Sequence, residues 1–158
     1  MSQRLLSLAL AVLVVACGGA TTSTAQAVAP QAGSEAAVQG FLRAVADSNL
    51  DKMAQLWGTS KGPAASTRQP SDYERRLVIV QAYLRGANFR IISNTEDQSS
   101  KDRRVLQVEM TRAGCDEIVP FTTTRAGKTW LVTAIALDAL GSPGRRCGEG
   151  EADSSSTQ

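Results

Sequence analysis

Apolar residues in the first part of the chain follow a helical spacing. A first amphipathic helix, with Ser34 placed as its cap, is predicted by four apolar positions at i, i+3, i+4 and i+7: Val38, Phe41, Leu42 and Val45. Ser48 and Asn49 interrupt this pattern. It restarts with the same spacing over Leu50, Met53, Ala54 and Trp57. We therefore expect two short helices that meet at a bend, the second of which is stopped by Gly58.

A third helix is predicted after a loop over residues 58–70 that contains two prolines. Ser71 and Glu74 have the spacing of a capping box, in which the glutamate side chain reaches back to the serine amide. The segment that follows places four apolar side chains on one side of a helix that ends near Gly86: Tyr73, Leu77, Val80 and Leu84.

From residue 89 onward the pattern is that of strands. Strands are expected over residues 89–92, around 106–110, over 118–124 and over 129–137, with turns at 97–102, 113–114 and 125–128. Pro120 lacks an amide donor, which places its strand at a sheet edge or at a bulge. The last strand is apolar on both faces, so both must be covered. If the helices cover one face, Leu131, Ile135 and Leu137 predict a homodimer or partner surface on the other.

Three helices followed by four strands predict an α+β domain, with the helices packed on one face of a curved antiparallel sheet of about four strands. The helical segments 37–46 and 49–57 resemble the start of nuclear transport factor 2-like domains (cystatin-related cone, SnoaL-like). The resemblance covers about residues 34–140 and rests on element order and apolar spacing. It implies a cone-shaped domain of a kind that many secreted bacterial lipoproteins of unassigned function carry.

The amino terminus resembles a bacterial lipoprotein signal. Arg4 precedes an apolar run of about 11 residues, shorter than the roughly 20 that a membrane-spanning helix needs. Val14-Val15-Ala16-Cys17 matches the lipobox, which implies removal of residues 1–16 and lipid attachment to Cys17. An ordinary secretory signal with an unmodified cysteine is the alternative. The expected location is the bacterial cell envelope, on its periplasmic side or at the cell surface. In a host with two membranes it is the outer membrane, because Gly18 follows the cysteine.

Composition divides the rest of the chain. Residues 17–33 are the lipidated cysteine and a tether of small uncharged residues, residues 34–141 are the α+β domain, and residues 142–158 are expected to be a mostly disordered tail. Cys115 and Cys147 remain once Cys17 is lipidated, and an oxidising compartment favours a disulfide between them. Free thiols or intermolecular pairing are the alternatives.

Charge and composition exclude several functions. The chain has no histidine, which removes the Ser-His-Asp triad and every histidine-ligated metal site. Its 17 basic and 15 acidic side chains and its 4% aromatic content argue against a nucleic-acid partner. Residues 127–129 (Gly-Lys-Thr) lack the first glycine of a phosphate-binding loop and are expected in a hairpin turn. We expect no cofactor and no metal. The basic doublets at 75–76, 103–104 and 145–146 predict solvated surface with, at most, weak attraction to anionic lipid.

Acidic pairs offer little geometry for catalysis. Asp47 and Asp51 are four apart across the bend, where they are expected to cap helices, and Asp116 and Glu117 point to opposite faces of a strand. Asp138, at the end of the last strand, is the one carboxylate that a small cone-fold isomerase, dehydratase or hydrolase could use as a buried base.

The remaining candidates are apolar. In a hollow cone six residues would line a pocket, and in a filled one they would be core: Phe41, Trp57, Tyr83, Met110, Phe121 and Trp130. We therefore expect a lipid-anchored envelope protein, bound to the membrane through Cys17. Its domain would bind a small apolar ligand or another envelope protein without catalysis.

Overall fold

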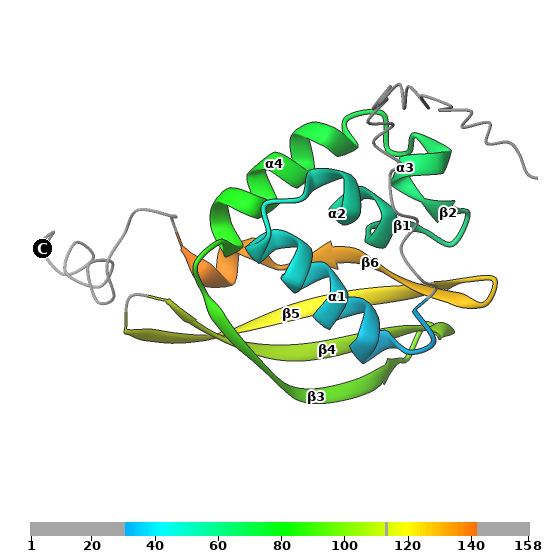
Figure 1. Cartoon of the computed structure of the whole chain (residues 1–158). Helices are drawn as coiled ribbons and strands as arrows, with labels where there is room; N and C mark the ends of the chain where they lie inside the picture. The colour runs from blue at the N-terminus through cyan, green and yellow to red at the C-terminus, as the bar shows by residue number, and fades with distance from the viewer. Residues whose placement is uncertain (1–30, 113, 142–158) are drawn as a thin grey trace, which may run out of the picture.

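A computed structural model describes residues 31–112 and 114–141, and over these residues it confirms the α+β arrangement (Figure 1). The helices lie together on one face of the main sheet. Their bounds are α1 (Ser34–Ala46), α2 (Leu50–Leu56), α3 (Ala64–Thr67) and α4 (Tyr73–Leu84). The main sheet has the order β3-β4-β5-β6, and every neighbouring pair is antiparallel. Its strands are β3 (Asn88–Asp97), β4 (Ser100–Arg112), β5 (Cys115–Ala126) and β6 (Thr129–Ile135). A short 3₁₀ helix, η1 (Leu137–Leu140), follows the last strand.

The helix starts differ from two of the sequence predictions. Ser34 is the first residue of α1 and Gly33 occupies the cap position, so Ser34 does not cap the helix. The capping box of α4 does not form either, because Asp72 is at the cap position and the Glu74 carboxylate instead accepts a hydrogen bond from the Tyr73 hydroxyl. The cap that does form is Asn49, whose Oδ1 accepts from the Lys52 amide at 2.9 Å.

The segment predicted as a loop over residues 58–70 contains regular structure. Two short strands, β1 (Gly58–Thr59) and β2 (Gly62–Pro63), pair with each other, and α3 follows directly. A side chain at Gly58 would collide with the Gly62 carbonyl and would lie 2.9 Å from Pro63 Cα. The close approach of these two strands therefore requires glycine at position 58.

β3, β4 and β5 are longer than the sequence predicts, whereas β6 is shorter and ends at Ile135, and two of the three strand pairs carry register shifts. The β3–β4 register shifts between Ile91 and Ser93, and the β5–β6 register shifts at Thr122 and Thr123. Pro120 lies on β5, which pairs with β4 along its length. Its carbonyl accepts from the Ala136 amide, just beyond the end of β6. The nitrogen of Pro120, which has no hydrogen to donate, therefore lies where the pairing of β5 with β6 ends. A proline is tolerated at such a local sheet edge.

The core lies between the helical layer and the facing side of the sheet. On α4 the predicted apolar stripe is confirmed, since Tyr73, Leu77, Val80 and Leu84 are all buried. The largest fully buried side chains come from both layers, and they include Phe41, Met53, Leu56, Leu77, Leu106, Met110, Phe121 and Leu131.

The homodimer or partner predicted on the last strand stays a prediction, but the three predicted residues are not free on an outer face. Leu131 is completely buried, and Ile135 and Leu137 pack against the core. The physical reason is the hairpin of β1 and β2, which packs on β6: the Leu131 Cδ1 atom would lie only 3.0 Å from a Cβ at Gly58. The strand also ends at Ile135, which leaves Leu137 in η1.

Candidate functional site

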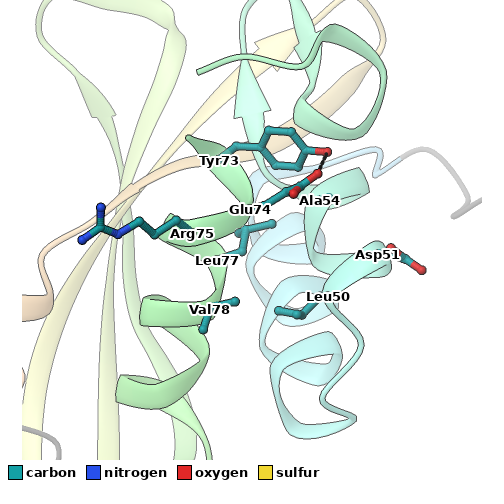
Figure 2. A pocket seen from close by; sticks show the side chains of 8 residues that line it. All are labelled: Leu50, Asp51, Ala54, Tyr73, Glu74, Arg75, Leu77 and Val78. Atoms are coloured by element: carbon teal, nitrogen blue, oxygen red, sulfur yellow. Dashed lines mark hydrogen bonds between the residues drawn. The ribbon is translucent and has the colours of Figure 1, made fainter. Parts of the chain in front are cut away.

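A groove runs between α2 and α4 on the outer side of the helical layer (Figure 2). Its volume is about 350 Å³. Two of its side chains are large, apolar and unusually exposed: Leu50 is 37% and Val78 is 50% accessible. The lining comprises Leu50, Asp51, Ala54, Tyr73, Glu74, Arg75, Leu77 and Val78.

The sequence builds this groove by placing apolar residues outside the core stripe of each helix. Asn49 caps α2 and thereby fixes Leu50 as its first residue, at the open end of the helix pair. On α4, Leu77 belongs to the buried stripe, whereas Val78 and Ile79 follow it and face outward. Val78 lines the groove and Ile79 does not. The floor of the groove, at Leu77, is therefore continuous with the core. Its wall, at Leu50 and Val78, carries apolar surface that no other described element covers.

Polar groups stand only at the rim of the groove. The Tyr73 hydroxyl donates to Glu74 Oε1 at 3.0 Å, and this hydrogen bond, with burial and the nearby negative charge, raises the pKa of Tyr73 above its ordinary value. Asp51 and Arg75 extend outward on opposite sides (Figure 2). Such an arrangement can hold an apolar group and orient its polar end.

The predicted pocket residues lie elsewhere. Phe41, Trp57, Met110 and Phe121 are buried members of one core cluster, and the rings of Phe41 and Trp57 pack with centroids 5.8 Å apart. Tyr83 and Trp130 are half-buried. None of the six lines the groove. For Phe41, Trp57, Met110 and Phe121, the packing supports the interpretation as core.

The acidic candidates are exposed. Asp138 lies on η1 with its side chain in solvent, so it is not the buried carboxylate that a cone-fold enzyme would need. Asp116 and Glu117 are also exposed, and Asp116 accepts from the Thr111 hydroxyl at 2.6 Å. Asp51 lines the groove, but Asp47 does not. Over the described ranges, no three acidic or cysteine side chains are close enough together to hold a metal ion.

The cysteines stay predictions. Cys115 is the first residue of β5. Its predicted partner Cys147, the predicted lipid site Cys17 and the tether and tail all lie outside the described residues, apart from residues 31–33 of the tether. Among residues 31–112 and 114–141, no helix combines the length and apolar character needed to cross a bilayer.

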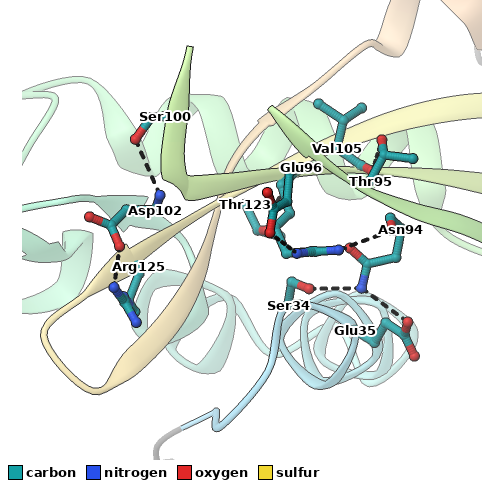
Figure 3. Close-up of polar contacts among 11 residues, drawn as sticks. Ser34, Glu35, Asn94, Thr95, Glu96, Ser100, Asp102, Val105, Thr123 and Arg125 are labelled. Carbon is teal, nitrogen blue, oxygen red and sulfur yellow. Dashed lines mark hydrogen bonds and ion pairs between the residues drawn. The ribbon is translucent and has the colours of Figure 1, made fainter. Parts of the chain in front are cut away.

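A second polar cluster joins α1 to the sheet (Figure 3). Asn94 on β3 donates to Ser34 Oγ and to Glu35 Oε1, both at 3.0 Å, and its own Oδ1 accepts from Arg104 Nε at 2.5 Å. The Arg104 guanidinium also donates to the Asn94 carbonyl at 3.1 Å. Each of these polar groups has its partner within the cluster, so the cluster fixes the first turn of α1 on the sheet and leaves no polar group for a ligand.

The groove was missed at the level of sequence because it depends on how α2 and α4 pack. The signal that could have indicated it is the run Leu77-Val78-Ile79, in which two apolar residues fall off the helical stripe. An amphipathic surface helix normally carries polar residues at such positions.

A solved structure resembles the described domain. No family model and no curated protein matches the chain. The solved structure is a protein from Cytophaga hutchinsonii, described as a nuclear transport factor 2-like protein of unknown function. Sequence identity is 8% and the TM-score is 0.40, over 68% of this chain and 92% of that chain. A likeness at this level carries no conclusion about family or function. The described architecture, N-terminal helices packed with a four-stranded antiparallel sheet, is consistent with a nuclear transport factor 2-like cone fold.

Proposed function

We propose that this protein is a lipid-anchored binding protein of a bacterial envelope, and that the groove between α2 and α4 takes a small apolar ligand. The observation that carries the proposal is the groove itself, with half-exposed Val78 and exposed Leu50 in its wall. Sites for small molecules are concave, mostly apolar and edged by a few polar groups.

The size of the groove fits a small ligand. Its volume of about 350 Å³ lies at the lower end of the roughly 300–1,000 Å³ common for ligand sites. Apolar surface left in water raises the free energy of the unliganded protein by about 25 cal/mol for each Å². A ligand that covers the exposed side chains of Leu50 and Val78 removes that cost, and this gain is the driving force for binding.

Binding to an apolar probe tests the groove. We expect N-phenyl-1-naphthylamine, whose fluorescence rises in apolar surroundings, to bind the protein. Val78→Asp should weaken this binding about tenfold or more, because a carboxylate in the wall would have to be desolvated. Ile79→Asp is the matched control, since Ile79 is 43% exposed on the same helix but does not line the groove. Equal loss in both variants, or equal binding in both, would contradict the proposal.

Membrane attachment rests on the lipobox at Val14–Cys17 and is tested separately. In bacteria supplied with labelled palmitate, the wild-type chain should take up label and sediment with membranes. Cys17→Ser should take up none, because the thioether bond to lipid cannot form. Label on the Cys17→Ser chain, or wild-type chain found only in the soluble fraction, would refute lipid anchoring while leaving the groove proposal intact.

A further inference from the structure

We propose that the end of the domain formed by the β1–β2, β3–β4 and β5–β6 turns faces an anionic bilayer and binds its headgroups through lysine side chains. This inference rests on the proposed lipid anchoring at Cys17. It adds the orientation of the domain and the chemistry of its contact. We call this end of the molecule the lysine end, after Lys61, Lys101 and Lys128.

The chain enters the domain at the lysine end. The Gln31 carbonyl accepts a hydrogen bond from the Trp130 amide at 2.9 Å, which places the entry point two residues from the β5–β6 turn. Fourteen residue steps separate Cys17 from Gln31, and even fully extended they reach about 50 Å. The chain therefore meets the domain at the end where the β3–β4 and β5–β6 turns lie (Figure 1). That end therefore stays within about 50 Å of the bilayer whenever the anchor is in place.

The lysine end carries a surplus of positive charge. Each of its three hairpins carries an exposed lysine: Lys61 between β1 and β2, Lys101 at the start of β4, and Lys128 between β5 and β6. In the described part of the chain, none of these three lysines forms an ion pair with an acidic side chain.

Three of the four neighbouring acidic groups are already paired with arginines. Asp97 pairs with Arg103, Asp102 pairs with Arg125 (Figure 3), and Glu96 pairs with Arg104 at 3.5 Å. The arginine doublet at 103–104 therefore contributes ion pairs within the protein, and the lysines supply the surplus positive charge. Glu35 is the remaining acidic group, and it accepts from Asn94.

Over the described residues, the opposite end of the sheet has no such surplus of positive charge. Around the β4–β5 turn and η1, exposed Asp116, Glu117 and Asp138 stand against Arg85 and Arg112. The Arg112 guanidinium also donates a hydrogen bond to the Tyr83 carbonyl at 2.7 Å. A tethered domain with this charge asymmetry turns its lysine end toward negative headgroups.

The attraction is weak for a free molecule and sufficient for an anchored one. One lysine close to an anionic membrane favours contact about fivefold, so three favour it on the order of a hundredfold. The tether keeps the domain at high effective concentration near the surface, so this factor sets orientation rather than attachment. Because charges are screened beyond about 8 Å at physiological ionic strength, the contact must be direct and salt-sensitive.

Fluorescence quenching tests the orientation on the full lipidated protein. The chain carries two tryptophans, of which Trp57 is buried and Trp130 lies two residues from Lys128. With Trp57→Phe as background, the protein is reconstituted in vesicles of brominated phosphatidylcholine with or without phosphatidylglycerol. We expect stronger quenching of Trp130 when phosphatidylglycerol is present, and loss of the difference at high salt.

Charge reversal identifies the residues. The variant Lys101→Glu with Lys128→Glu should abolish the extra quenching, whereas Arg43→Glu with Arg85→Glu makes the same charge change on exposed helix positions and should keep it. Equal quenching in neutral and anionic vesicles, or equal effects of both variants, overturns the proposal. Failure of the wild-type protein to float with vesicles of either kind overturns the anchoring, and this inference with it.

Amide exchange gives a second readout that needs no substitution. On the wild-type lipoprotein, exchange at residues 98–101 and 127–128 should slow severalfold on anionic relative to neutral bilayers. Exchange around residues 114–117, at the opposite end, should not change. Slowing at the opposite end instead would show the reverse orientation and contradict the proposal.

Discussion

Ser48 shows how a single backbone conformation limits the stability of this domain. It follows α1 with φ of 53°, in the left-handed region, and its amide and that of Asn49 close the helix on Val45 and Ala44. A residue with a Cβ pays about 1–2 kcal/mol for this conformation, which glycine adopts freely.

We therefore predict that Ser48→Gly raises the free energy of unfolding by about 0.5–1 kcal/mol. Urea denaturation followed by circular dichroism measures the change. Ser48→Val is the counterpart and should lower stability, because a β-branched side chain tolerates positive φ least. A destabilised glycine variant would show that this turn is not under strain.

Asp97 links one turn to acid stability. Its Oδ1 accepts from the Ser99 amide at 2.8 Å and the Ser99 hydroxyl at 2.6 Å, and Arg103 lies 3.4 Å away. These hydrogen bonds, with the smaller effect of Arg103, lower the pKa of Asp97 below its ordinary value.

The sign of the pH dependence follows from that direction. A carboxyl group whose pKa is lower in the folded state adds stability above its unfolded pKa of about 3.9, and this stability is lost as pH falls through the folded pKa. Asp97→Asn should therefore be less stable than wild type at neutral pH, and the difference should shrink below about pH 4. Thermal denaturation at several pH values measures it. A difference that stays constant down to the acid limit would contradict the role assigned to this carboxylate.

At the scale of elements, the spacing of apolar residues was enough to predict α1, α2, α4 and the order of the strands. This spacing did not predict structure that depends on only two or three residues. β1 and β2 are two residues each, too short to show a period, and they exist because Gly58 permits close approach to Gly62 and Pro63. The same hairpin also packs against Leu131 and buries this leucine, which the alternating pattern placed on an outer face.

Gly58→Ala tests the account of the β1–β2 hairpin. We predict a loss of about 1–3 kcal/mol, because the added methyl group has backbone atoms rather than a mobile side chain in its way. Gly40→Ala is the matched control: it lies inside α1, and its new Cβ would meet Leu56 Cδ1 at 3.5 Å, an ordinary contact. That control should gain roughly 0.5–1 kcal/mol from helix propensity. Denaturant midpoints of both variants measure these changes in stability. A Gly58→Ala variant as stable as wild type would refute the close approach of the two strands.

At the scale of the whole molecule, the fold was easier to predict than the site. A sequence shows which residues prefer the interior, and Phe41, Met110 and Phe121 are there. It does not show whether the interior leaves room for a ligand, or where two helices part at the surface. The groove is lined by residues of α2 and α4 and therefore depends on how these two helices pack. The predicted pocket and the observed groove therefore share no residue.

The central claim is that an apolar ligand binds in the groove between α2 and α4, and the most direct test is to map its position by NMR. The amide chemical shifts of the protein are followed during titration with N-phenyl-1-naphthylamine. We predict saturable shifts concentrated at residues 50–54 and 73–78, with the sheet unaffected. Shifts centred on Phe41, Met110 and Phe121 would place the ligand inside the cone, and they would contradict the assignment of the groove as the binding site.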